Sequence, residues 1–266
     1  MSNAMLVETA PFVRRERDAR GVVKLTLDRP QSFNALSEGM LAALQSELDA
    51  AAADDTVRVV VIAAEGKAFS AGHDLKQMRA EPSQAYYEAL FAQCARMMLT
   101  IQRLPVPVIA RVQGIATAAG CQLVAACDLA VAASTARFAV SGVNLGLFCS
   151  APSVPLSRNL ARKAAFEMLV TGEFISAEEA KAKGLVNRVA APESLDAEVE
   201  ALVAAIVAKP RVAIAMGKQL FYRQLETGIE AAYLDAGHTM ACNMMDEAAL
   251  EGVQAFIDKR KPAWSG

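Results

Sequence analysis

The sequence predicts an α/β fold with a largely parallel sheet that is covered on both faces. In the first half of the chain, short valine-rich runs alternate with stretches of helical periodicity, which is the order expected for parallel strands joined by helices. The runs are almost continuously apolar, as strands buried on both faces require. Beyond about residue 152 the pattern becomes mainly helical. We therefore expect an α/β core followed by a helical region.

The first expected elements are a strand, a helix and a second strand. Residues 22–27 form an apolar run that ends in the turn-forming residues 28–30. Ser37 is a suitable N-cap for a helix in which apolar residues recur at helical spacing. Residues 58–63 predict a fully buried strand. A glycine-containing loop is expected over residues 65–74.

A long helix and a second group of strands are expected next. The helix should extend from about residue 83 to residue 103, because two prolines in residues 104–107 prevent its continuation. A buried strand over residues 108–112 follows. We then expect a small-residue turn, a helix and a strand, at residues 114–120, 121–127 and 129–132.

The second half of the chain begins a helical C-terminal region. Ser176 and Glu179 have the spacing of a capping box, and Gly184 lies where that helix should end. Residues 185–189 read as a strand, and the pattern is then mainly helical to Lys261. We expect a core over residues 5–200 and a helical subdomain over residues 201–266 that packs on neighbouring subunits. Residues 1–4 resemble a cloning remnant.

Composition and charge limit the partners of this protein. No apolar run approaches the ~20 residues that a membrane-spanning helix needs, and the formal net charge of -2 gives no electrostatic reason to bind nucleic acid. The five cysteines show no paired spacing and are expected to be reduced core thiols of a cytoplasmic protein. The two histidines are far apart in sequence, so no metal site is expected.

Two segments, residues 64–76 and 105–123, have the pattern of a site for a carbonyl oxygen. In each, a strand ends in small residues and a helix can begin. The first peptide N–H groups of a helix lack intrahelical partners and lie at the positive end of its dipole. Two such turns facing each other would place two donors on one oxygen, as a thioester enolate or a tetrahedral oxyanion requires. Small-residue turns also serve ordinary helix–sheet packing, so this pattern alone is not specific.

Two motifs in these segments resemble the enoyl-CoA hydratase/isomerase (crotonase) family. The first is Phe69-Ser70-Ala71-Gly72-His73-Asp74-Leu75-Lys76. The second combines Gly114 with Ala119-Gly120-Cys121-Gln122-Leu123 and Cys127-Asp128. The resemblance covers nearly the whole chain. It implies a crotonase β-β-α superhelix with a helical C-terminal oligomerisation subdomain, trimers or pairs of trimers, and an acyl-CoA substrate, with coenzyme A as part of the substrate and no separate cofactor.

The resemblance also implies roles for individual residues. The peptide N–H groups of His73 and Ala119 would be the two oxyanion donors. The backbone of Ser70, Ala71 and Leu75 would line the adenine end of coenzyme A, with Lys76 near the phosphates. The remaining expected substrate-binding residues are Gly72, Asp74, Gly120 and Phe148.

The chain departs from the family pattern at the two positions where family hydratases carry glutamate. Those positions hold Gln122 and Gly142 here. Glutamine cannot exchange a proton near neutral pH, and glycine has no side chain. Because a positioned acid or base contributes ~10²–10⁴-fold, ordinary hydration is doubtful. Asn144 and Ser150 are candidate substitutes, Cys149 has no evident base beside it, and the His73 imidazole is more simply a solvated or locally hydrogen-bonded group.

Three functions remain open from the sequence. The protein is a hydratase or isomerase with replaced catalytic groups, it performs another enolate reaction on an acyl-CoA, or it binds acyl-CoA without turnover. Loss of both carboxylates favours the last two, and retention of both turn motifs indicates a ligand.

Overall fold

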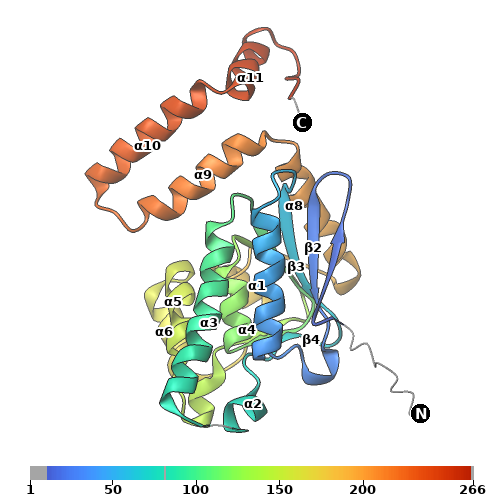
Figure 1. Ribbon diagram of the computed structural model, residues 1–266, viewed down its shortest axis with the longest axis vertical. Helices are drawn as coiled ribbons and strands as arrows, with labels where there is room; N and C mark the ends of the chain where they lie inside the picture. The colour runs from blue at the N-terminus through green and yellow to red at the C-terminus, as the bar shows by residue number, and fades with distance from the viewer. Residues whose placement is uncertain (1–10, 81, 265–266) are drawn as a thin grey trace, which may run out of the picture.

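A computed structural model describes residues 11–80 and 82–264, and Figure 1 shows its ribbon. The expected cloning remnant at residues 1–4 lies outside the described residues. The strands are β1 (Val13–Arg17), β2 (Val22–Leu27), β3 (Val59–Ala64), β4 (Ala68–Ser70), β5 (Val108–Val112), β6 (Ile115–Thr117), β7 (Leu129–Ala133), β8 (Arg137–Ala139), β9 (Ile175–Ser176) and β10 (Arg188–Ala190). The α-helices are α1 (Glu38–Ala52), α2 (Leu75–Ala80), α3 (Gln84–Arg103), α4 (Ala119–Ala126), α5 (Ser150–Asn159), α6 (Arg162–Thr171), α7 (Ala177–Lys183), α8 (Leu195–Val207), α9 (Arg211–Gln224), α10 (Ile229–Met244) and α11 (Glu247–Ile257). Short 3₁₀ turns are η1 (Pro30–Ser32), η2 (Ser141–Leu145) and η3 (Pro192–Ser194).

A six-stranded sheet forms the centre of the core. Its order is β1-β2-β3-β5-β7-β10, and every neighbouring pair is parallel except β1 with β2. All six residues of β3 are buried, as its unbroken apolar sequence predicts. The predicted α/β class with a largely parallel sheet is therefore confirmed.

Helices cover both faces of this sheet. The larger apolar cluster lies on the face covered by α1, α3 and α4, and α1 and α3 pack side by side over it (Figure 1). Their starts agree with the sequence, because the hydroxyls of Ser37 and Ser83 accept the N–H groups of Met40 and Tyr86. On the other face, α8 packs against β3, β5 and β7 in a smaller apolar cluster.

A second, four-stranded sheet lies where the sequence indicated only loops and turns. Its order is β4-β6-β8-β9, and β4 and β6 fall inside the expected loop and the expected small-residue turn. Three-residue strands are too short to show a periodic apolar pattern. They depend on close backbone approach: a Cβ on Gly114 would lie 2.0 Å from the Lys67 carbonyl oxygen. This sheet brings the two candidate oxyanion segments together.

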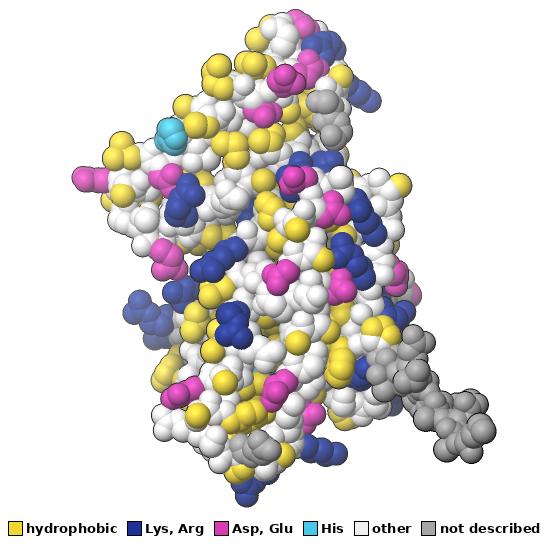
Figure 2. All heavy atoms as spheres, viewed as in Figure 1, with side chains coloured by type: hydrophobic (Ala, Val, Ile, Leu, Met, Phe, Trp, Pro, Cys, Tyr) yellow, Lys and Arg dark blue, Asp and Glu magenta, His cyan; other side chains and the backbone are white. Residues whose placement is uncertain are grey.

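Helices α9, α10 and α11 extend from one end of the core (Figure 1). Residue 200, the expected boundary, lies within α8, which packs on the sheet, so the projecting helices begin with α9. The exposed side chains of α10 and α11 include many large apolar residues, seen as yellow groups on the upper helices in Figure 2. Within the described residues, no helix combines the length and apolarity needed to span a membrane.

Candidate active site

The two small-residue turns meet where β4 and β6 end. These strands are parallel neighbours, so their carboxyl ends lie together. A Cβ on Gly72 would lie 3.0 Å from both the Ala119 nitrogen and the Ala118 Cβ. A Cβ on Gly120 would lie 2.1 Å from the Ser70 carbonyl oxygen. Glycine at 72 and 120 therefore lets the first turn of α4 contact the segment after β4.

Both expected oxyanion donors are peptide N–H groups without a protein acceptor. Ala119 is the first residue of α4, so its N–H has no intrahelical partner. Among the residues that the structure describes, the N–H of His73 and the N–H of Ala119 donate to no backbone or side-chain acceptor. With Gly72 in contact with Ala119, the structure places these two groups in neighbouring turns. Unpaired N–H groups beside a packed core are costly unless a ligand or water accepts them.

Strained backbone precedes the second donor. Ala118 has φ 51° and ψ −122°, a conformation that favours glycine because a Cβ crowds the backbone there. Such strain costs about 1–3 kcal/mol, and it persists when the surrounding structure enforces it. Here Ala118 donates its N–H to the Ala139 carbonyl of β8, at 3.0 Å. The strained residue sets the direction of the peptide that carries the Ala119 N–H.

A tight turn over residues 33–36 supports the first donor segment. The Ala71 N–H donates to Phe33 at 3.0 Å, and the Leu36 N–H donates to Gly72 at 2.7 Å. The buried Asn34 side chain donates to the carbonyls of Glu65 and Ala68, at 2.8 and 2.9 Å. Sequence analysis did not find Asn34. Its only local signal is an asparagine after Asp-Arg-Pro, a residue type that tolerates the φ of 51° found here.

Ser70 and Asp74 have structural hydrogen bonds within the same segment. The buried Ser70 hydroxyl donates to the Asn34 carbonyl at 2.9 Å and accepts the Gly72 N–H at 3.3 Å. The Asp74 carboxylate accepts the N–H groups of Lys76 and Gln77, at 2.9 and 3.2 Å, and so caps the short helix α2. Leu75 and Lys76 are exposed on that helix.

The His73 imidazole is held by residues outside the oxyanion turns. Its Nδ1 lies 3.2 Å from the Leu36 carbonyl oxygen, and its ring centroid is 5.5 Å from that of Phe91 on α3. Burial lowers the pKa of His73, and the hydrogen bond to Leu36 partly opposes this shift. The side chain is thus engaged locally, and His73 offers the site its peptide N–H.

Gln122 lies one helical turn after Ala119, so the two residues share a face of α4. Its side chain is only 4% exposed. Its Oε1 has no hydrogen-bond partner among the described residues. Native proteins pair most buried polar atoms, so an unpaired amide on this face is typical of a binding site. Glutamine at this position therefore faces the site with an unused polar group.

Position 142 has no space for a side chain. A Cβ on Gly142 would lie 2.5 Å from the Leu147 carbonyl oxygen and 2.7 Å from the Cys149 sulfur. The Gly142 N–H donates to that sulfur at 3.3 Å. The neighbouring hydroxyls of Ser141 and Thr117 are 2.9 Å apart, which links this loop to the end of β6.

The other tentative site residues lie on the exposed part of the same loop. Asn144 donates from Nδ2 to the Gly172 carbonyl at 3.3 Å, after the end of α6. The N–H and the hydroxyl of Ser150 lie 2.8 and 3.4 Å from the Phe148 carbonyl, at the start of α5. Asn144, Phe148 and Ser150 are all exposed. The structure brings Gly72 to Ala119, Gly120 to Ser70, and Gly142 to Cys149.

Comparison with known proteins decides the family. A sequence model described as enoyl-CoA hydratase/isomerase matches residues 17–266. The chain belongs to the enoyl-CoA hydratase/isomerase family.

Several family members are similar to the chain over nearly its whole length. The mouse protein named enoyl-CoA hydratase domain-containing protein 3, mitochondrial, is 44% identical over 97% of this chain and 86% of its own length. A crystal structure of the human protein of that name has a TM-score of 0.92, at 43% identity over 95% of this chain and all of the solved chain. An enoyl-CoA hydratase structure from Mycobacterium smegmatis has a TM-score of 0.95, at 70% identity over 96% of this chain and all of the solved chain. These structures confirm the predicted crotonase fold.

The expectation of a cytoplasmic location is wrong by these comparisons. The mouse, rat, frog, human and zebrafish relatives all carry the word mitochondrial in their names. Cysteine spacing and charge, on which the expectation rested, do not distinguish one reducing compartment from another.

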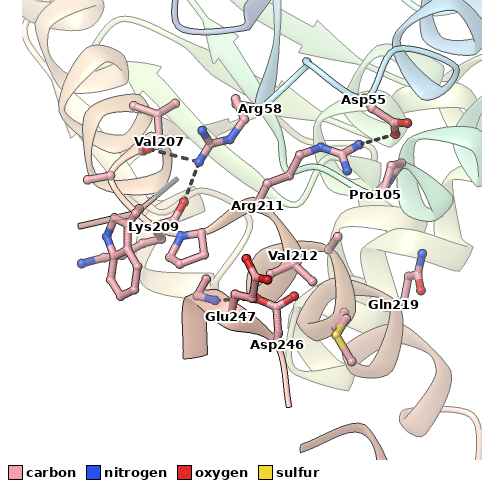
Figure 3. A pocket seen from close by; sticks show the side chains of 16 residues that line it. Asp55, Arg58, Pro105, Val207, Lys209, Arg211, Val212, Gln219, Asp246 and Glu247 are labelled. Carbon is pink, nitrogen blue, oxygen red and sulfur yellow. Dashed lines mark hydrogen bonds and ion pairs between the residues drawn. The ribbon is translucent and has the colours of Figure 1, made fainter. Parts of the chain in front are cut away.

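One cavity lies away from the family site. It has a volume of about 800 Å³ and opens between the core and helices α9 and α11. Figure 3 shows Arg58 bonded to the Val207 and Lys209 carbonyls, and Arg211 paired with Asp55. None of the residues proposed for acyl-CoA lines this cavity. Within the described ranges, no cluster of three or more metal-ligating side chains is present.

Proposed function

We propose that this protein binds an acyl-CoA thioester and stabilises its enolate between the peptide N–H groups of His73 and Ala119. The observation that carries the proposal is the pair of unpaired donors in contacting turns. Removing one such donor from an enzyme costs about 2.7–4 kcal/mol of transition-state stabilisation. Because the strain at Ala118 is already present in the folded protein, the donors need no rearrangement when negative charge develops on the oxygen.

The coenzyme A portion would lie along the segment after β4. The backbone of Ser70, Ala71 and Leu75 would contact the adenine end, and Lys76 would approach the phosphates. The exposure of Leu75 and Lys76 on α2 supports this placement, because the phosphates of a bound nucleotide keep contact with water. Asp74 would contribute through the cap that orients α2.

Ordinary hydration is not the reaction we propose. Gln122 lies on the face of Ala119 with its amide unpaired, and an amide neither takes nor gives a proton near neutral pH. Position 142 is filled by its neighbours, so no carboxylate stands there. The site retains oxyanion stabilisation without the two carboxylates that would activate water.

The second candidate function is acyl-CoA binding without turnover. The same two positions favour it, because Gln122 and Gly142 supply no acid or base. The two functions share the ligand and differ in whether a proton moves to or from the α-carbon.

We further infer that the protein forms trimers or pairs of trimers through its C-terminal helices. Exposed apolar side chains on α10 and α11 support this inference, and the most exposed belong to Ile229, Tyr233, Leu234 and Phe256, with Met245 between the two helices. An apolar surface of this kind on separate helices is typical of a protein interface.

Calorimetric titration with matched ligands tests the proposed function. The panel consists of butyryl-CoA, free coenzyme A, and a thioether analogue of butyryl-CoA in which CH₂ replaces the carbonyl. If the two N–H groups bind the thioester oxygen, butyryl-CoA should bind at least about tenfold more tightly than the thioether, a difference of about 1.4 kcal/mol. Equal affinity for the two would contradict the oxyanion site. No binding of any member would contradict the acyl-CoA proposal as a whole.

A further inference from the structure

An enolate site needs a group that exchanges a proton with the α-carbon. Neither Gln122 nor Gly142 can be that group. The nearest titratable side chain to Gly142 is Cys149, whose sulfur accepts the Gly142 N–H at 3.3 Å. We propose, on the basis of the acyl-CoA function above, that the Cys149 thiol is the proton-transfer group for the α-carbon of the bound thioester.

Three contacts place this sulfur at the site. It occupies the space that a side chain at position 142 would enter, 2.7 Å from the expected Cβ. It is near enough to Cys121, which lies in the first turn of α4 two residues after Ala119, to contribute to the raised pKa of that thiol. Cys149 is also the N-cap residue of α5, and α5 packs against α4.

The hydrogen bond from Gly142 leaves the thiol proton available. The Gly142 N–H uses the sulfur as an acceptor, so the S–H group is free to donate elsewhere. Within the part of the chain that the structure describes, no acceptor for this S–H is present. Gln122, on the same helix turn as Cys121, has an unpaired buried Oε1, which independently indicates that a ligand belongs here.

The proton transfer balances without another reactant. The Cys149 thiolate takes a proton from the α-carbon, and the electron pair of the broken C–H bond becomes the enolate, whose oxygen accepts from His73 and Ala119. The resulting thiol exchanges its proton with water. Returning the proton to the α-carbon breaks the S–H bond and restores the thioester and the thiolate. The Gly142 N–H and the N-terminus of α5 stabilise the thiolate stage.

The surroundings of the thiol set the pH dependence. Burial raises the pKa of Cys149, and the Gly142 N–H partly opposes this shift. Among the described residues, the titratable group that faces Cys149 from α4 is the Cys121 thiol, whose pKa is raised to about 12 by burial. On the side of the 3₁₀ turn η2, the group that contacts the Cys149 sulfur is the uncharged peptide of Gly142. Cys149 is therefore mostly protonated at neutral pH, and the thiolate fraction rises about tenfold for each pH unit below its pKa.

Deuterium exchange tests this role. Butyryl-CoA is incubated with the protein in D₂O, and deuterium at the α-carbon is measured by mass spectrometry, alongside calorimetric affinity for the same ligand. Cys149→Ala should slow exchange at least about 100-fold, the low end of the contribution of a positioned acid or base, and should leave affinity nearly unchanged. Cys149→Ser keeps the size of the side chain and should also lose exchange. Cys242→Ser, at the exposed cysteine on α10, is the control and should exchange like the natural protein.

Each outcome bears on one of the two proposals. Binding without exchange in the natural protein, or undiminished exchange in Cys149→Ala, overturns the role of Cys149 and leaves acyl-CoA binding standing. Absence of binding overturns the proposed function and this role with it. If both Cys149 variants fail to fold, the pH dependence of the natural protein tests the role instead. The thiolate fraction must increase between about pH 6 and about pH 8. A rate of deuterium exchange that does not rise over that range therefore overturns the role.

Discussion

At position 142, a side chain would meet the Leu147 carbonyl oxygen and the Cys149 sulfur, 2.5 and 2.7 Å from its Cβ. The carbonyl belongs to backbone and cannot rotate away, so even one methyl group requires the loop to move. At position 122, by contrast, glutamate would replace the glutamine amide with a carboxylate of the same length and add no bulk. The two departures from the family pattern therefore differ physically. Gln122 changes only the chemistry of its position, whereas Gly142 also changes the space available for a side chain.

Restoring both glutamates should not restore hydration. We expect Gln122→Glu with Gly142→Glu to hydrate crotonyl-CoA less than about tenfold faster than the natural protein, although two working carboxylates would each contribute ~10²–10⁴-fold. The assay follows the loss of the enoyl thioester absorbance. Gln122→Glu alone is the control, since it adds one carboxylate without the steric conflict. Rapid turnover by the double variant would show that the loop over residues 142–149 adjusts easily.

The same steric argument predicts a stability change at position 142. Gly142→Ala should lower the free energy of unfolding by about 1–3 kcal/mol, the usual range for overpacking. Gly217→Ala is the matched control, because a Cβ there meets nothing within 4 Å. Since Gly217 lies inside α9, this control should instead gain about 0.5–1 kcal/mol. Urea unfolding of both variants measures the difference, and equal stabilities would contradict the contact.

Crowding the oxyanion turns should weaken ligand binding. In Gly72→Ala, the new Cβ would lie 3.0 Å from the Ala119 nitrogen, and the φ of +88° is unfavourable for alanine. We expect butyryl-CoA to bind at least about tenfold more weakly, a loss of about 1.4 kcal/mol. Ala119→Trp should have a larger effect, because Ala119 is buried in the turn itself. Calorimetric titration measures both, and unchanged affinity in Ala119→Trp would exclude this turn as the site.

At the scale of elements, one buried cluster fixes α9 to the core. The Lys218 ammonium donates to the carbonyls of Ile101 and Val106 at 2.9 Å and to Asp128 at 2.6 Å. Asp128 also accepts the Tyr222 hydroxyl at 2.7 Å and the Val108 N–H at 2.6 Å. The cluster thus joins α9 to the end of α3 and the start of β5. All polar atoms of the ion pair have partners, which such burial requires.

Breaking this ion pair should destabilise the fold strongly. Lys218→Met leaves the Asp128 carboxylate without its cation and should cost about 3–5 kcal/mol. Arg223→Met is the control on the same helix, because its partner Asp235 lies on the neighbouring helix α10 and the pair, with side chains 52% and 32% exposed, is screened by water. Chemical unfolding measures both variants. A small effect for Lys218→Met, similar to that of Arg223→Met, would mean that water replaces the lysine at Asp128.

For the whole molecule, the projecting helices expose many large apolar side chains (Figures 1 and 2). Leu234 is 78% exposed and Phe256 is 85% exposed. Residues of α9 and α11 line the cavity of Figure 3, and each of these helices buries one residue within the chain, Lys218 and Ala255. Association with other copies would bury the exposed side chains.

Charged residues on these helices should therefore reduce assembly. Light scattering of the natural protein should give a mass of three or six chains, and Leu234→Asp combined with Phe256→Asp should shift it toward one chain. Leu99→Asp, at an exposed leucine on α3, is the control for the same chemical change on the core surface. A natural protein that is already monomeric would contradict the proposed trimer.

Local patterns determined much of the fold. The apolar runs of β2 and β5 agree with the structure at both ends, and the serine caps of α1 and α7 form as expected. These features depend on neighbours within a few residues, which a sequence displays directly. The candidate oxyanion turns were also found from sequence, because two motifs at characteristic positions carry the family resemblance.

Tertiary structure alone decided which groups surround those turns. Asn34, 36 residues before Ser70 in the chain, supports the first donor, and the Cys149 sulfur fills the space beside Gly142. The Asn34–Ser70 contact leaves no local signal, because 36 residues separate its partners. The Gly142–Cys149 contact lies within one irregular loop, which shows no periodic pattern. The sequence by itself determined the fold class and predicted the positions of both donors; the folding of the loop over residues 142–149 decided that position 142 has no room for a side chain and that the Cys149 thiol fills the space beside it.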